Sequence, residues 1–158
     1  MKPQIQFRAM GPADYSQFAQ ATSYHPGPTF GGIVAYHDDV IMGAVGLDSW
    51  TPTSCMAHWW IRHPRCIMPL WREVCGYLAQ YGRRKIVGWT PGDNVRALRM
   101  IFNRLGFIEV ARIKDAWDDG VDIVISEYRI NVTEQHGASG HGRNADASTG
   151  EVERICAA

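Results

Sequence analysis

The segment that most constrains the fold of this chain lies between residues 85 and 113. An apolar run, Lys85–Thr90 (KIVGWT), is followed by Pro91-Gly92-Asp93, a sequence typical of a turn. After the turn, apolar residues recur at helical spacing, namely Ala97, Leu98, Ile101, Phe102 and Leu105. Gly106 suits the left-handed residue that commonly ends a helix, and Phe107 opens a second strand-like run. The pattern predicts a strand, a helix over 94–105 and another strand in direct succession.

Similar periodicities divide the rest of the chain into alternating elements. Strand-like runs cover 4–10, 32–37, 40–47, 55–62, 85–89, 107–113 and 121–130, and helical patterns cover 12–23, 69–81 and 94–105. The strand–helix–strand order around 55–89 predicts a parallel strand pair joined by a right-handed crossover. A chain of 158 residues can bury one substantial core. We therefore expect a single domain that mixes helices and strands, of the α/β (α+β) class.

The composition of the chain changes at Asn131. Residues 131–158 are rich in Gly, Ser, Ala, Asn and His and contain few large apolar side chains. Such a segment cannot bury enough apolar surface to fold on its own. We therefore expect a folded domain over 1–130 and a low-complexity tail over 131–158 that can become ordered on a protein partner.

Charge and cysteine usage argue against several classes of protein. The 16 Lys and Arg residues balance the 16 Asp and Glu residues, so no global basic field attracts nucleic acid. The cysteines, which are Cys55, Cys66, Cys75 and Cys156, form neither a CxxC pair nor a zinc-finger spacing. No apolar run approaches the ~20 residues of a membrane helix, and residues 1–10 lack a signal-peptide pattern. These features predict a cytoplasmic protein that does not insert into a membrane.

A group of residues around the predicted helix over 94–105 carries a family resemblance. They are Asn94, Ala97, Arg104, Leu105, Gly106 and Phe107. An Asn, a small residue three positions later, a basic amphipathic helix and a Leu-Gly-Phe ending resemble a segment of the GNAT (GCN5-related N-acetyltransferase) superfamily. The first elements, Ile5–Arg8 and a helix around Asp14, are similar to the family's first strand and helix. The resemblance covers residues 3–130.

The resemblance implies a fold and a reaction. The fold is a mixed, largely antiparallel sheet of about seven strands, with a central parallel pair and about three helices. The reaction is the transfer of an acetyl group from acetyl-CoA to an amine, which attacks the thioester directly in the splay between the strands over 55–62 and 85–89. Pairing of the last strands between subunits can also form a homo-oligomer in this fold. A narrower resemblance to small phage-encoded GNAT-like proteins rests on Pro64 after a Trp-rich strand, and on Lys114–Trp117 followed by Gly120–Asp122.

The expected cofactor-binding residues are Trp60, Ile61, Arg62, Arg65, Cys66 and Asn94. The family's glycine-containing diphosphate loop is replaced here by Arg62–Pro69 (RHPRCIMP), in which Arg65 and Ile67 occupy the glycine positions. Two interpretations stay open: the guanidinium groups of Arg62 and Arg65 bind phosphate oxygens, or they are surface charges beside a remodelled cleft.

Two further departures from the family concern the helix over 94–105. Phe102 occupies the position of the Tyr that serves many members as general acid. The spacing from Asn94 to Gly106 is also one residue longer than usual, which predicts either a later helix start or a bulge.

The candidate general bases are His58 and Asp48. His58 lies in phase with Trp60 on its strand, and a neutral imidazole can accept a proton from an amine near neutral pH. The alternatives are a hydrogen-bonded histidine in a packed Trp layer and a turn-forming aspartate. Four tryptophans either line an acceptor pocket or fill core volume, namely Trp59, Trp60, Trp89 and Trp117. Cys66 is a weaker candidate nucleophile, because only His63 is close to it in sequence.

These observations leave three functions open. The first is an acyl-CoA-dependent N-acyltransferase. The second is a non-catalytic GNAT-like module, structural or host-interacting in a phage, that binds a protein partner through the tail over 131–158. The third is a GNAT-like enzyme that modifies DNA bases.

Overall fold

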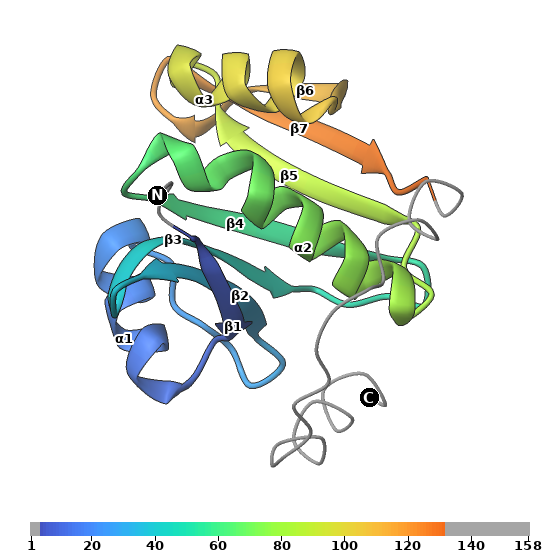
Figure 1. The fold of residues 1–158 in the computed structure, drawn as a ribbon. Helices are drawn as coiled ribbons and strands as arrows, with labels where there is room; N and C mark the ends of the chain where they lie inside the picture. The colour runs from blue at the N-terminus through green and yellow to red at the C-terminus, as the bar shows by residue number, and fades with distance from the viewer. Residues whose placement is uncertain (1–3, 132–158) are drawn as a thin grey trace.

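The computed structural model describes residues 4–131. Its elements in chain order are β1 (Gln6–Ala9), α1 (Pro12–Thr22), β2 (Gly31–His37), β3 (Val40–Asp48), β4 (Ser54–Ile61), the 3-10 turn η1 (Pro64–Cys66), α2 (Ile67–Gln80), β5 (Lys85–Pro91), α3 (Val95–Met100), the π-helical turn η2 (Ile101–Leu105), β6 (Ile108–Asp118) and β7 (Val121–Arg129). The predicted order of strands and helices is confirmed (Figure 1). The predicted tail lies outside the described residues, apart from Asn131.

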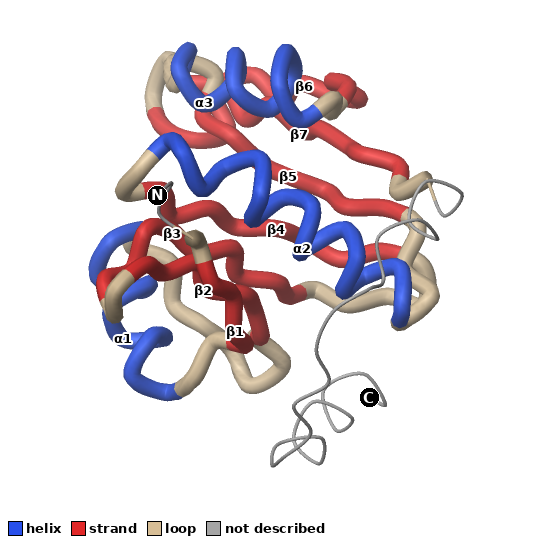
Figure 2. Tube along the Cα trace, viewed as in Figure 1, coloured by secondary structure: helices blue, strands red, loops and turns tan. Residues whose placement is uncertain are grey.

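The strands form one seven-stranded sheet in the order β1-β2-β3-β4-β5-β7-β6 (Figure 2). Neighbouring strands are antiparallel except for β4 and β5, which are parallel, as the sequence predicts. β4 and β5 pair only from Ser54 to Met56 on the β4 side, although both strands continue further. The two strands therefore diverge in the middle of the sheet.

Alternation along the strands divides the core between the two faces of the sheet. On β4, Ala57 and Cys55 pack with α2 in one cluster, whereas Trp60 packs with Phe18 of α1 in the other. Ile101 of the α3–η2 helix packs in the same cluster as α2, on the same face of the sheet. α1 and α2 thus cover opposite faces, and β4 contributes side chains to both.

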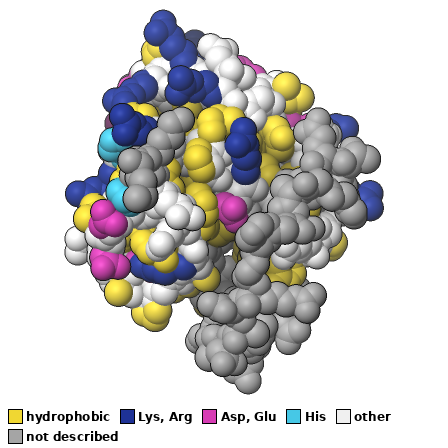
Figure 3. All heavy atoms as spheres, in the orientation of Figure 1, with side chains coloured by type: hydrophobic (Ala, Val, Ile, Leu, Met, Phe, Trp, Pro, Cys, Tyr) yellow, Lys and Arg dark blue, Asp and Glu magenta, His cyan; other side chains and the backbone are white. Residues whose placement is uncertain are grey.

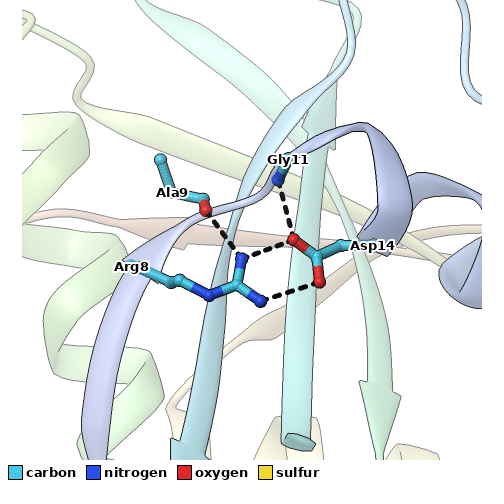
Figure 4. Close-up of polar contacts among 4 residues, drawn as sticks. All are labelled: Arg8, Ala9, Gly11 and Asp14. Atoms are coloured by element: carbon cyan, nitrogen blue, oxygen red, sulfur yellow. Dashed lines mark hydrogen bonds and ion pairs between the residues drawn. The ribbon is translucent and has the colours of Figure 1, made fainter. Parts of the chain in front are cut away.

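An ion pair fixes the start of α1 to β1. The Asp14 carboxylate accepts hydrogen bonds from both terminal nitrogens of Arg8, one at 2.9 Å, and from the Gly11 N–H at 2.8 Å (Figure 4). The Arg8 guanidinium also donates to the Ala9 carbonyl at 3.2 Å. Asp14 is 5% exposed, and its contacts connect the edge strand β1 to α1.

The helix after β5 contains the predicted irregularity. Asn94 caps α3 by accepting a hydrogen bond from the Ala97 N–H at 3.1 Å, so the helix does not start later. The extra residue is instead absorbed by the π-helical turn Ile101–Leu105, and Gly106 ends the helix with φ of 81°. The other long helix, α2, begins at Ile67, two residues before the predicted start, because η1 leads directly into it.

None of the helices within residues 4–131 is long and apolar enough to cross a membrane.

Candidate functional site

A cleft opens where β4 and β5 diverge. It contains a cavity of about 830 Å³ lined by side chains from both faces of the sheet. Met56, His58 and Trp60 line it from the α1 face, and Ala57, Trp59 and Ile61 line it from the α2 face. The cavity thus reaches from one face of the sheet to the other.

The edge of β4 supplies backbone groups to this passage. The Thr53 carbonyl accepts hydrogen bonds from the N–H groups of Arg84, just before β5, and of Lys85, its first residue, at 2.8 and 3.1 Å, so the peptide groups of Thr53 face β5. Peptide groups of alternate residues point to the same side of a strand, and those of Ala57, Trp59 and Ile61 therefore also face β5. Trp59 and Ile61 lie beyond Met56, the last β4 residue that pairs with β5, so their N–H and C=O groups are available to an extended ligand with amide groups.

The cleft continues on the α2 face into a basic pocket of about 600 Å³. Four arginines line it, Arg62 after β4 and Arg96, Arg99 and Arg104 on the α3–η2 helix. None of the four forms an ion pair with a carboxylate in the described part of the chain. Lys and Arg side chains gather over the α3 end of this face (Figure 3). The pocket therefore offers concentrated, uncompensated positive charge to an anionic group.

The loop before α2 contributes little to anion binding through its backbone. The Arg65 N–H donates to the His63 ring nitrogen at 3.3 Å, and the Cys66 N–H donates to the His63 carbonyl at 3.2 Å. The Ile67 N–H donates to the Pro64 carbonyl, and Pro64 has no N–H to donate. The first amides of the loop are thus used within the 3-10 turn, and the arginine side chains carry the positive charge.

Arg65 and Cys66 lie away from the cleft. The Arg65 side chain is exposed and lines neither pocket. The Cys66 thiol is buried, donates to the Met42 carbonyl at 3.4 Å, and has its pKa raised by that burial. A raised pKa disfavours the thiolate, so the structure does not support the interpretation of Cys66 as a nucleophile.

Asn94 lies at the junction of the two pockets and lines both. Its side-chain oxygen is occupied by the cap of α3, as described above, and its amide nitrogen remains a hydrogen-bond donor toward the cleft.

His58 and Asp48 form a hydrogen-bonded pair in the wall of the larger cavity. His58 Nε2 lies 3.1 Å from Asp48 Oδ1, and the two side chains are 19% and 11% exposed. Because an ionised carboxylate only accepts hydrogen bonds, the proton of the neutral ring resides on Nε2 and the lone pair on Nδ1. The Tyr24 ring stacks on the imidazole with 3.9 Å between centroids. With Nε2 bonded to Asp48, Nδ1 is the nitrogen of the neutral ring that can accept a proton.

The tryptophans both fill the core and line the cavity. Trp59 packs on Trp71, and Trp60 packs edge-on against Phe18. Both also line the cavity, together with Trp89 and Trp117, which are each 53% exposed. The two interpretations of these residues are therefore compatible.

Known structures share the fold of this chain, although no protein-family model and no curated protein matches the sequence. A protein from Desulfovibrio desulfuricans, assigned as an acetyltransferase of the GNAT family, superposes with a TM-score of 0.65 at 18% identity, covering 81% of this chain and 100% of its own. Spermidine/spermine N-acetyltransferase from Vibrio cholerae gives 0.67 at 14% identity, covering 80% and 92%. A protein from Salmonella typhimurium, assigned as an acetyltransferase and solved with its cofactor acetyl-CoA, gives 0.62 at 13% identity, covering 85% and 96%. The chain has the GNAT fold.

Within the GNAT fold, the predicted site residues separate into two groups. His58, Asp48, Trp60, Ile61, Arg62 and Asn94 line the cleft, whereas Arg65 and Cys66 do not. Phe102, at the position of the family's Tyr, packs against the core cluster of α2 and lines neither pocket.

Sequence reasoning missed Tyr24 and the helix arginines Arg96 and Arg99. The i, i+3 spacing of these two arginines could have indicated a shared helix face beside Asn94. Tyr24 lies in a loop rich in proline and glycine, and no periodic pattern indicates its contact with His58.

Proposed function

We propose that this protein is an acyl-CoA-dependent N-acyltransferase that transfers an acetyl group to a primary amine. The observation that carries the proposal is the charge division of the cleft. Among the described residues, the basic pocket is lined by four arginines and no carboxylate, whereas the larger cavity is lined by Asp48 and His58 on its α1 face and by no Lys or Arg. An anionic, phosphate-bearing donor fits the first, and an amine fits the second.

Each part of the cleft has a role in this proposal. The arginines hold the phosphates of CoA, in place of the loop amides that the 3-10 turn uses internally. The free peptide groups at Trp59 and Ile61 align the pantetheine arm and orient the thioester carbonyl. Bound acetyl-CoA supplies an activated acyl group at the point where the strands diverge.

His58 receives the first proton in this mechanism. An amine arrives as an ammonium ion, and Nδ1 of His58 takes one proton, while Asp48 holds the ring and stabilises the resulting charge. The amine nitrogen then forms the new C–N bond and the C–S bond breaks. The second proton of the nitrogen goes to the departing sulfur, so the products are the amide and CoA thiol. Phe102 need not supply a proton in this scheme.

The test is acetyl-CoA consumption with a panel of primary amines, followed by release of free CoA thiol. We expect amine-dependent release, and we expect His58→Gln to lower kcat by about 10²-fold or more, as for removal of a general base. His37→Gln is the matched control, because His37 is partly exposed, pairs with the exposed Asp38 at 3.4 Å and lies outside the cleft. Equal activity of the two variants would refute the role of His58. A protein that binds CoA but releases no thiol with any amine would refute the transfer reaction.

A second candidate function is supported by the exposed edge of the sheet. Every residue of β6 is exposed, and Ile108, Val110 and Ile113 are 57%, 48% and 49% exposed. An open, partly apolar edge strand can pair with another chain. The alternative is therefore a GNAT-fold interaction module, such as the phage proteins that the hairpin motif resembles. It predicts no acetyl-CoA binding and a stable complex through β6.

A further inference from the structure

The acceptor side of the cleft has an unusual concentration of aromatic rings. Tyr24, Trp60, Trp89 and Trp117 line the cavity beside the His58–Asp48 pair. Trp89 and Trp117 are each 53% exposed, and large exposed rings that share one cavity wall form the kind of apolar patch that marks a binding site. These two rings belong to different strands, β5 and β6, and they meet in the wall of one cavity.

A bulge in β6 brings Trp117 into this wall. The pairing of β6 with β7 is interrupted between Ile113 and Asp118, and Asp115 within the interruption has a left-handed φ of 51°. The Asp115 N–H donates to the Asp122 carboxylate at 3.2 Å, which holds the bulge. Bulges commonly redirect a side chain toward a site. The aromatic wall therefore depends on a specific local distortion of the strand.

The larger cavity carries little charge, and the charged side chain in its lining is an acid. Among the described residues that line the larger cavity, Asp48 is the one carboxylate, His58 is the one imidazole, and Lys and Arg are absent. A polyanionic acceptor meets no cation here. A polyamine with three or four charges meets one carboxylate, which is already shared with an imidazole. A single ammonium group on an apolar body matches the cavity best.

We infer that the acceptor is an arylalkylamine, a primary amine with one positive charge carried on a flat aromatic group. This inference rests on the proposed function and narrows its substrate. The aromatic group packs against Trp89, Trp117 and Tyr24, and the ammonium group lies toward Asp48 and His58. Trp89 and Trp117 are then specificity-determining residues that contact the part of the acceptor remote from the reacting nitrogen.

The experiment compares kcat/KM for 2-phenylethylamine, tryptamine, hexylamine and spermidine at saturating acetyl-CoA. We expect both aromatic amines to exceed hexylamine and spermidine. Trp89→Leu and Trp117→Leu should each lower kcat/KM for the aromatic amines by about 3–10-fold and lower that for hexylamine by clearly less, because an alkyl chain loses less contact with the rings. Ile113→Ala is the control, because Ile113 is a similarly exposed apolar residue of β6 outside the cavity. Preference for spermidine, or Trp variants without a selective effect, would overturn the inference.

A binding measurement separates this inference from the transfer reaction. Proton NMR of the tryptophan indoles, titrated with 2-phenylethylamine and with its neutral analogue 2-phenylethanol, needs no turnover. We expect the amine to perturb the Trp89 and Trp117 signals and to bind more tightly than the alcohol by about 10-fold, an advantage that Asp48→Asn removes. Binding without thiol release would retain the aromatic site and refute the transfer. Turnover of other amines without 2-phenylethylamine binding would refute the aromatic site alone.

Discussion

Gly46 is a position where one added methyl group should have a large and predictable effect. A Cβ at residue 46 would lie 2.2 Å and 2.5 Å from two ring carbons of Phe30 and 3.1 Å from Phe18. Ordinary carbon contacts are about 3.5–4.0 Å, so the Phe30 ring would have to move by more than about 1 Å. Phe30 and Phe18 are 3% and 0% exposed, which leaves no open direction for that movement. Overpacking of this kind should destabilise Gly46→Ala by about 2–3 kcal/mol.

The assay is equilibrium urea unfolding, with Gly27→Ala as the matched control. A Cβ at Gly27 meets nothing within 4 Å, so this variant should be neutral or more stable by about 0.4–1 kcal/mol. A Gly46→Ala protein as stable as the control would refute the packing described for the α1 face.

The same substitution should affect the acceptor side of the cleft before the donor side. Phe30 packs on Tyr24 with 5.6 Å between ring centroids, and Tyr24 stacks on His58. Gly46 is also the β3 partner of His58 in the sheet. We therefore expect Gly46→Ala, measured where it is still folded, to raise KM for the amine and leave acetyl-CoA affinity unchanged. An equal loss of both would contradict the separation of the two sides.

Three further predictions test other parts of the structure. Hydrogen bonds from Arg8 hold the pKa of Asp14 below its usual range. The interaction therefore stabilises the fold above about pH 4, and this stabilisation is lost as the pH falls through the lowered pKa of the folded state. Asp14→Asn should cost about 1–2 kcal/mol at neutral pH, and the stability of this variant should change less in acid than that of the wild type. Burial raises the pKa of Cys55 and Cys75 to about 12 and also raises the pKa of Cys66. A Cys156→Ser variant should therefore contain no thiol that is rapidly alkylated at neutral pH, and fast modification of Cys66 would contradict its burial. Asn94→Ala removes the cap of α3 and should cost about 0.5–2 kcal/mol in urea unfolding, whereas Asn94→Asp, which keeps the capping oxygen, should cost less.

The order of elements could be predicted because it depends on local patterns. The change from an apolar run and a turn to helical spacing between Lys85 and Phe107 predicts a strand followed by a helix, and the structure contains β5, α3 and η2 there. The one-residue excess between Asn94 and Gly106 predicts a bulge or a later start, and the π-helical turn is the outcome because Asn94 keeps its capping role. Caps and turns are properties of neighbouring residues, so the sequence contains enough information to locate them.

The composition of the cleft depended on contacts between distant segments. The burial of Cys66 follows from its position beneath Gly43 of β3, where an added Cβ would lie 2.8 Å from the Cys66 sulfur. The loop of Tyr24 reaches His58 only because α1 packs on the face to which His58 points. Neither contact can be recognised from the spacing or the composition of the sequence. For this reason the sequence alone indicated neither the burial of Cys66 nor the contact of Tyr24 with His58.

The arginines around the basic pocket come from two segments. Arg62 follows β4, whereas Arg96 and Arg99 belong to the α3–η2 helix, and Arg65 lines neither pocket. Whether a residue near the start of a helix faces a cleft depends on the rotation of that helix, which here is set by Ile101 and Leu105 in the core. The rotation of the helix cannot be predicted from local sequence, because it depends on packing between distant segments.

The most direct test of the account is a calorimetric titration of acetyl-CoA into the wild-type chain and into an Arg96→Gln, Arg99→Gln double variant. Arg129→Gln is the control, because Arg129 is 76% exposed and lies at the end of β7 remote from the cleft. The account predicts micromolar binding to the wild type and the control, and binding weaker by about 10–100-fold in the double variant. Absence of binding at millimolar acetyl-CoA, or equal affinity of all three proteins, would contradict it.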